Sequence, residues 1–183
     1  YGRRQRQMCI RDSDYAIKNE CNVMSWPLTR PFTEAELYKK QLDDAIAVNK
    51  SNFKPIFAMM RHAAVYTNNE DKEKALIAIR SVLGQFENLF KNLGDVQNGF
   101  TKQIPVNELE GREQYDPDML TKNLLFGNPE EIIRKLKLYQ DLGVDEFIYY
   151  ASMGLGHKEQ KKSLKLFIEA VSYTHLRAHE TRI

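Results

Sequence analysis

Hydrophobic residues in this sequence gather in short, nearly unbroken apolar runs that alternate with segments in which apolar positions recur at helical spacing. An unbroken run predicts a β-strand covered on both faces, as in a parallel sheet. Such runs occupy residues 21–26, 55–66 and 144–150. The helical spacing predicts amphipathic helices over residues 33–49, 70–93, 129–142 and from 157 onward. The alternation of the two patterns predicts an α/β fold with a parallel sheet.

Two of the expected helices carry signals at their ends. Asn128 suits the N-cap position, Pro129 suits the first helical position, and Gly143 can adopt the left-handed conformation that ends a helix. Thr33 and Glu36 have the spacing of a capping box at the start of another helix. These signals predict well-defined boundaries for both helices.

Residues 95–126 lack such periodicity. A polar stretch is interrupted there by Gly99, Pro105, Gly111 and Pro117. Because this stretch is longer than an ordinary connector, it favours an active-site insertion or lid.

The two ends of the sequence have an unusual relationship. Residues 7–13 can be back-translated into a DNA word whose reverse complement, read in frame, encodes residues 171–176. That word resembles a transposase adaptor used to prepare sequencing libraries. We therefore expect residues 1–13 and 171–183 to be translated adaptor that contributes nothing to the fold, and residues 14–170 to be the protein itself. A genuine basic tail for nucleic acid or a membrane is the alternative.

Charge and cysteine content narrow the functional classes. The sequence has 27 basic and 25 acidic residues and a net charge of +2. The expected adaptor segments hold six arginines and two acids, so 21 basic and 23 acidic residues remain, with a net charge of −2. We therefore expect no nucleic-acid partner. Cys21 is the one cysteine outside these segments, which excludes a disulfide framework and favours a cytoplasmic location. No apolar run is long enough to span a bilayer, so no membrane partner is expected.

Five motifs resemble segments of one known family. They are Asn22–Trp26, Arg61–Tyr66, Gly127–Ile133, Leu142–Phe147 and Ser163–Phe167. In this order and spacing they are similar to segments of the bacterial luciferase-like flavin-dependent monooxygenases. The resemblance covers the expected protein region and implies the C-terminal part of a (β/α)₈ TIM barrel, with about three strands and their helices plus an insertion. Because a barrel is stabilised by closing on itself, we expect this fragment alone to be unstable or to aggregate.

The resemblance also implies a flavin site at the carboxyl ends of the strands. Ser25 would hydrogen-bond the polar edge of the isoalloxazine ring, and Trp26 would pack near that ring. Tyr150 and Gly154 follow the last expected strand, where Gly154 would let the backbone approach the cofactor. Plain core packing is the alternative for Trp26.

Arg61 and His62 interrupt the second apolar run and are the candidate catalytic residues. Because an unpaired buried charge is costly, Arg61 would pair with an anionic substrate group or stabilise the oxygenated flavin. A structural ion pair with a barrel carboxylate is its alternative. Neighbouring side chains of a regular strand point to opposite faces, so only one of the two can enter the barrel unless a bulge intervenes. We expect that residue to be Arg61, which leaves His62 a structural position.

Cofactor and partners follow from the resemblance. It implies reduced FMN and no metal, with molecular oxygen and a small-molecule substrate as reactants. It also implies a flavin reductase as the source of reduced flavin and a homodimer for the full-length protein. Two other functions stay open. One is an F420-dependent oxidoreductase of the same superfamily that transfers hydride, and the other is a non-enzymatic α/β interaction module.

Overall fold

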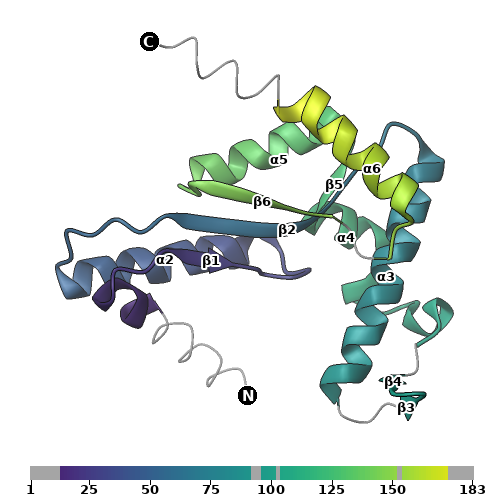
Figure 1. Cartoon of the computed structure of the whole chain (residues 1–183), viewed down its shortest axis with the longest axis horizontal. Coiled ribbons are helices and arrows are strands. Elements are labelled where there is room, and N and C mark those ends of the chain that lie inside the picture. Colours follow the sequence, from purple (N-terminus) through teal and green to yellow (C-terminus); the bar gives the residue numbers. More distant parts are fainter. Residues whose placement is uncertain (1–12, 92–95, 102–103, 152–153, 173–183) are drawn as a thin grey trace. The chain divides into compact units, whose positions relative to one another are not determined.

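A computed structural model describes residues 13–91, 96–101, 104–151 and 154–172 (Figure 1). The chain divides into two compact units, one formed by residues up to 61 with 135–149, the other by residues 62–134 with those from 150 onward. Their boundary falls between Arg61 and His62, which are neighbours on strand β2 (Phe57–Val65). Residues 1–12 and 173–183, which make up most of the expected adaptor segments, lie outside the described residues.

The first unit is built around the first half of β2. It also contains β1 (Val23–Ser25), α2 (Phe32–Asn49), the second half of α5 (Pro129–Asp141) and most of β6 (Glu146–Ala151). β1 runs parallel to β2, with Val23 opposite Phe57 and Ser25 opposite Met59. The buried core consists of Ile17, Ala35, Leu42, Ala45, Phe57, Met59 and Tyr139. Helices α2 and α5 therefore cover the face of β2 that carries Phe57 and Met59.

The second unit is built around the other half of β2. It also contains α3 (Asn69–Lys91), α4 (Pro117–Asn123), β5 (Leu125–Gly127) and α6 (His157–Leu166), which continues as a π-helix over Phe167–Ser172. β5 runs parallel to β2, with Ala63 opposite Leu125 and Val65 opposite Gly127. The buried core consists of Ala64, Tyr66, Ala75, Leu76, Ile79, Leu120, Leu124 and Phe126.

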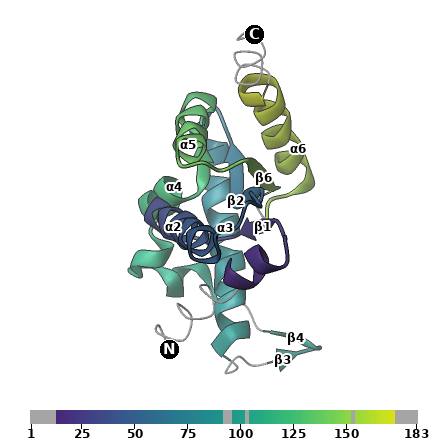
Figure 2. The ribbon, with the colours of Figure 1, turned by 90° about the vertical axis from the view of Figure 1, so that its left-hand side faces the viewer.

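The segment expected to be an insertion contains short regular elements. Strands β3 (Val96–Gln97) and β4 (Phe100–Thr101) form an antiparallel hairpin beside the carboxyl-terminal part of α3 (Figure 2). Two 3₁₀ turns follow at Val106–Leu109 and Glu113–Tyr115, and α4 completes the segment. Its role as an insertion or lid stays a prediction.

The three expected strands are present as β1, β2 and β6. The sheet also contains β5, so it has four strands, in which β1, β5 and β6 each pair with β2. The sequence pattern did not predict β5, because three apolar residues at the edge of a polar stretch are too few to show a period. The α/β fold with a parallel sheet is confirmed.

The signals at the ends of α5 are confirmed. The Asn128 side chain accepts a hydrogen bond from the Glu131 N–H over 3.0 Å, and the Glu131 carboxylate accepts one from the Asn128 N–H over 2.8 Å. This is a reciprocal capping box. Gly143 ends the helix region with a φ of 89°, a conformation that favours glycine.

The capping box expected at Thr33 and Glu36 is wrong. Helix α2 begins one residue earlier, at Phe32, and Pro31 occupies the N-cap without a side-chain hydrogen bond. Thr33 consequently lies inside the first turn. Within the described residues no helix combines the length and apolarity needed to cross a membrane.

Candidate functional site

The six residues expected to form the site fall into two groups. The first unit holds Ser25, Trp26 and Arg61, and the second holds His62, Tyr150 and Gly154. The structure brings Arg61 to the turn that follows Trp26, and it brings His62 into contact with Tyr150.

Arg61 is fully buried, with 0% of its surface exposed. Its Nε donates a hydrogen bond to the Tyr139 hydroxyl over 2.8 Å. Its Nη1 donates to the backbone carbonyls of Leu28 and Arg30, over 3.2 and 2.8 Å. Its Nη2 is buried without a hydrogen-bond partner among the described residues. Three neutral oxygen atoms therefore hold the guanidinium.

The orientation expected for Arg61 is wrong. Its bond to Tyr139 places the guanidinium on the face of β2 that carries Phe57 and Met59, the face covered by helices. In a TIM barrel the helices form the outer layer, so this face is not the barrel interior. The sequence could not distinguish the two faces because both are apolar. No carboxylate forms an ion pair with Arg61 in the described part of the chain, and its catalytic role stays a prediction.

The surroundings of Arg61 are apolar and aromatic. Burial lowers the pKa of its guanidinium, because a poorly solvated site disfavours charge. Burial also raises the pKa of the Tyr139 hydroxyl, and the nearby guanidinium opposes that shift. Tyr139 is therefore a neutral acceptor at neutral pH. Phe32 and Phe147 pack against its ring, with centroids 5.1 and 5.3 Å away.

Ser25 and Trp26 lie at the carboxyl end of β1. Both side chains are partly buried, and the indole nitrogen of Trp26 is buried. The chain then turns over Pro27–Arg30, where the Arg30 N–H donates to the Pro27 carbonyl over 2.8 Å. Leu28 adopts a φ of 50° in this turn. The two residues thus occupy the strand end where a barrel site is expected.

His62 and Tyr150 pack together in the second unit. Their ring centroids lie 4.9 Å apart with the planes tilted by 49°, and His62 is buried. This geometry is that of a packed ring pair. The catalytic role of His62 and the flavin contact of Tyr150 stay predictions.

Gly154 makes a close backbone approach to helix α3. A Cβ on Gly154 would lie 2.8 Å from the Ala78 carbonyl oxygen and 3.1 Å from the Val82 side chain. Its φ of 86° also favours glycine. Packing of the protein on itself is therefore enough to require glycine here, and cofactor binding by Gly154 stays a prediction.

Sequence reasoning missed a polar pocket of the second unit. It has a volume of about 230 Å³ and lies where the chain leaves β2 and β5 toward α3 and α5. Its lining is polar, with the amides of Asn68, Asn69 and Asn128, the hydroxyls of Thr67 and Thr121, the phenol of Tyr66, the amine of Lys72 and the carboxylate of Glu131. Ligands of parallel α/β proteins bind at this edge of the sheet. The available signal was that Asn68 and Asn128 each follow an apolar strand.

Tyr66 is the buried titratable group of this pocket. Burial raises its pKa to about 12, and the negative charge of Glu131 adds to the shift. A hydrogen bond with Thr121 acts in the opposite direction. The phenol therefore stays protonated at neutral pH and can serve as a neutral hydrogen-bonding group.

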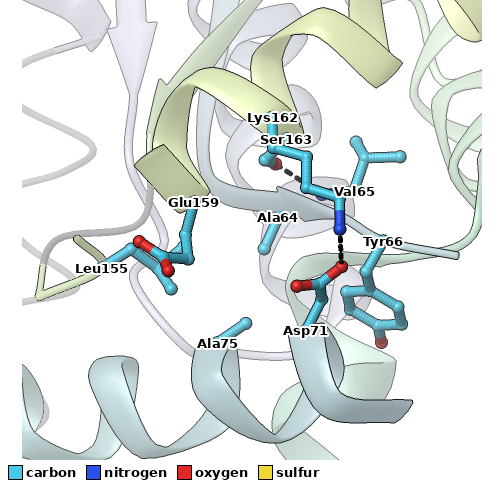
Figure 3. Close-up of a pocket in the computed structure, with 9 residues that line it drawn as sticks. All are labelled: Ala64, Val65, Tyr66, Asp71, Ala75, Leu155, Glu159, Lys162 and Ser163. Carbon is cyan, nitrogen blue, oxygen red and sulfur yellow. Dashed lines mark hydrogen bonds and ion pairs between the residues drawn. The ribbon is translucent and has the colours of Figure 1, made fainter. Parts of the chain in front are cut away.

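A second, much smaller pocket lies between β2, α3 and α6 (Figure 3). Its volume of about 10 Å³ is at the lower limit for one water molecule. The Ser163 hydroxyl accepts a hydrogen bond from the Val65 N–H over 2.7 Å, and Lys162 pairs with Asp71 over 2.5 Å. These contacts attach α6 to β2 and α3, so the pocket is a packing gap.

Comparison with known proteins agrees with the motifs. No family model matches the chain. The chain is 27% identical over 158 residues to the oxygenase component of the flavin-dependent trigonelline monooxygenase of Acinetobacter baylyi (strain ATCC 33305 / BD413 / ADP1). That match covers 86% of this chain and 44% of the relative. The resemblance to the luciferase-like flavin-dependent monooxygenases is confirmed.

Two solved structures support the luciferase-like fold. The monooxygenase RslO1 from Streptomyces bottropensis matches with a TM-score of 0.59 and 15% identity, over 91% of this chain and 45% of that chain. An F420-dependent secondary alcohol dehydrogenase in complex with an F420-acetone adduct matches with a TM-score of 0.56 and 14% identity, over 90% and 44%. The chain thus spans less than half the length of these relatives, and its α/β architecture is that of part of a TIM barrel.

Proposed function

We propose that this chain is part of a luciferase-like monooxygenase that uses reduced FMN and molecular oxygen to oxidise a small organic substrate. The similarity to the trigonelline monooxygenase component carries this proposal, because it extends over 86% of the chain. The relative is named as an oxygenase component, which supports a separate flavin reductase as the partner that supplies reduced FMN. Trigonelline is therefore the first substrate to test.

The residues at the strand ends fit parts of a flavin. Ser25 shares the face of its partner Met59, but as the last residue of β1 its hydroxyl can hydrogen-bond the polar edge of a ring system at the strand end, where Trp26 offers an aromatic face for packing. The polar pocket, at about 230 Å³, is smaller than the roughly 300 Å³ at which sites for whole drug-sized ligands begin. It suits only a polar part of a cofactor or a small substrate. Bound FMN would supply the oxygen chemistry, while Ser25 and Trp26 would bind and orient it.

An F420-dependent oxidoreductase is the second candidate. The observation in its favour is the fold similarity to the F420-dependent alcohol dehydrogenase, whose TM-score is close to that of the monooxygenase. Both neighbours are enzymes, which favours catalysis over a pure interaction module.

Fluorescence of the whole purified chain tests the proposal. Trp26 is the single tryptophan of the sequence, so its emission reports directly on a flavin bound beside it. Under anaerobic conditions we expect saturable quenching by reduced FMN and weaker quenching by reduced F420. Tighter binding of F420 would favour the second candidate. No quenching by either compound, in a chain that circular dichroism shows to be folded, would contradict both.

A pair of serine variants gives the control for this titration. Ser25→Ala removes the proposed hydrogen bond to the ring, and we expect the Kd for FMN to rise about five- to tenfold. Ser51 lies in the same unit, and its hydroxyl accepts a hydrogen bond from the nearby Phe53 N–H. Ser51→Ala is therefore expected to leave the Kd unchanged. An equal effect of both substitutions would argue against a specific contact from Ser25.

A further inference from the structure

Arg61 connects three parts of the first unit. It sits on β2, reaches the Pro27–Arg30 turn through two backbone carbonyls, and reaches α5 through Tyr139. We propose that Arg61 is a positioning residue that fixes this turn, and through it fixes Ser25 and Trp26 at the end of β1.

Beyond the buried Pro27, the turn has little burial to hold it, since Leu28 and Arg30 are both exposed. Leu28 has a positive φ, which a residue with a side chain rarely adopts, and 45% of its surface is exposed. Packing of the Leu28 side chain therefore does little to hold the turn. Its carbonyl and that of Arg30 both accept from Nη1 of Arg61, which fixes the backbone directly.

The geometry requires an arginine. A guanidinium is planar and directs its N–H groups along fixed, divergent lines, so Nε can bond Tyr139 while Nη1 bonds two carbonyls. A lysine ammonium is a single point at the end of a flexible chain and cannot reach all three oxygens in this way.

Positioning explains the observations better than direct catalysis. The side chain of Arg61 is fully buried on the helix-covered face, and its hydrogen bonds go to atoms of the protein itself. The turn it holds follows directly after Ser25 and Trp26. The link from these two residues to a flavin rests on the proposed function, whereas the ordering of the turn does not.

Trp26 fluorescence without flavin tests the inference. Arg61→Lys keeps the charge and loses the planar guanidinium, and Arg61→Met keeps an unbranched apolar stem and loses every donor. In both variants we expect a red shift of Trp26 emission and about a twofold rise in acrylamide quenching, because a locally released turn exposes the indole. Unchanged emission and quenching in both folded variants would overturn the proposal.

Asp145→Ala is the matched control. The Asp145 carboxylate accepts a hydrogen bond from the Phe57 N–H over 2.8 Å. Phe57 lies in the same unit and on the same strand as Arg61. Its loss weakens the start of β2 without touching the turn, so we expect Trp26 quenching to stay at the wild-type value. A rise equal to that of Arg61→Lys would show that Trp26 reports general loosening and would contradict the positioning role.

A measurement on the wild-type chain covers the case in which the Arg61 variants do not fold. In nitrogen-15 NMR of the wild type, the Arg61 Nε–H should exchange with solvent far more slowly than that of exposed Arg30. Equal exchange rates would overturn the proposal. Increased exposure of Trp26 in Arg61→Lys would support the positioning role of Arg61 whether or not FMN quenches Trp26 of the wild type. If FMN does not quench it, only the proposed function fails.

Discussion

Different kinds of side-chain contact connect β2 to the surrounding elements in the two units. In the first, a buried guanidinium at Arg61 bridges the strand to a turn and to a helix through neutral oxygens. In the second, the buried contact is a neutral hydroxyl, since Ser163 accepts from the Val65 N–H. The charged contact there, between Lys162 and Asp71, has side chains that are 53% and 17% exposed.

From this difference we expect exposure to water, more than the number or charge of the bonds, to decide how much each contact contributes to stability. A buried oxygen that loses its donor stays unsatisfied, whereas an exposed charge that loses its partner is solvated again. The contact at Arg61 should therefore matter most to stability and the pair at Lys162 least, although both involve a full positive charge.

The largest effect is expected at Arg61. Arg61→Ala leaves the Tyr139 hydroxyl and two backbone carbonyls without their donor and opens a cavity beside Met59 and the aromatic rings. We expect the free energy of unfolding to fall by about 3 kcal/mol or more. Urea unfolding followed by circular dichroism measures it. If Arg61→Ala lowers the free energy of unfolding by less than about 1 kcal/mol, the buried contact would contribute no more than an exposed ion pair, and burial would not decide the order of the effects.

An intermediate effect is expected at Tyr66, a buried neutral group of the second unit. Its pKa is raised from 10.0 to about 12 in the folded chain. Between pH 10 and about pH 12 the Tyr66 hydroxyl is deprotonated in the unfolded chain but still protonated in the folded one. The free energy of unfolding therefore falls as the pH rises through this range, by up to about 3 kcal/mol. Tyr66→Phe has no proton to release and should lack this part of the loss. Urea unfolding of both proteins at pH 9 and 11 tests this, and a difference that stays constant would contradict it.

The smallest effect is expected at Lys162. Lys162→Met removes the ion pair to Asp71 and should lower stability at pH 7 by about 1 kcal/mol or less. The hydrogen bond from Lys162 lowers the pKa of Asp71. Its contribution is therefore present above the ordinary pKa of aspartate and is lost as the pH falls through the lowered value. Ser163→Ala is the buried counterpart, with an expected loss of about 1–3 kcal/mol. A larger loss for Lys162→Met in urea unfolding would reverse the ranking.

Much of the fold could be predicted because its signals are local. The apolar runs of β1, β2 and β6 lie within single stretches of sequence, and the N-cap at Asn128 and the stop at Gly143 depend on neighbouring residues. Strand β5 was missed because it lies at the end of the aperiodic stretch 95–126, whereas β1, which is equally short, lies within the longer run 21–26. The start of α2 was misplaced because Pro31 takes the N-cap position without contributing a side-chain bond.

The site was less accessible because it depends on contacts between distant residues. Nothing near Arg61 in the sequence shows that Tyr139 and the Leu28 carbonyl will meet its guanidinium. The alternation of side chains along a strand predicts which residues of β2 share a face. Because both faces of β2 are apolar, it does not predict which face the helices cover. Gly154 was expected to let the backbone approach a cofactor, and only the fold shows that Ala78 is its neighbour.

The lining of the polar pocket has a consequence for ligand charge. Its two formal charges, on Lys72 and Glu131, are opposite and cancel, and the Glu131 carboxylate already accepts the Asn128 N–H. A phosphate dianion would gain little net attraction there. A ligand with separated positive and negative ends could place its positive end near Glu131 and its negative end near Lys72. This pocket is therefore suited to discriminate among small dipolar molecules by orientation, and it is a poor anchor for a nucleotide-like tail.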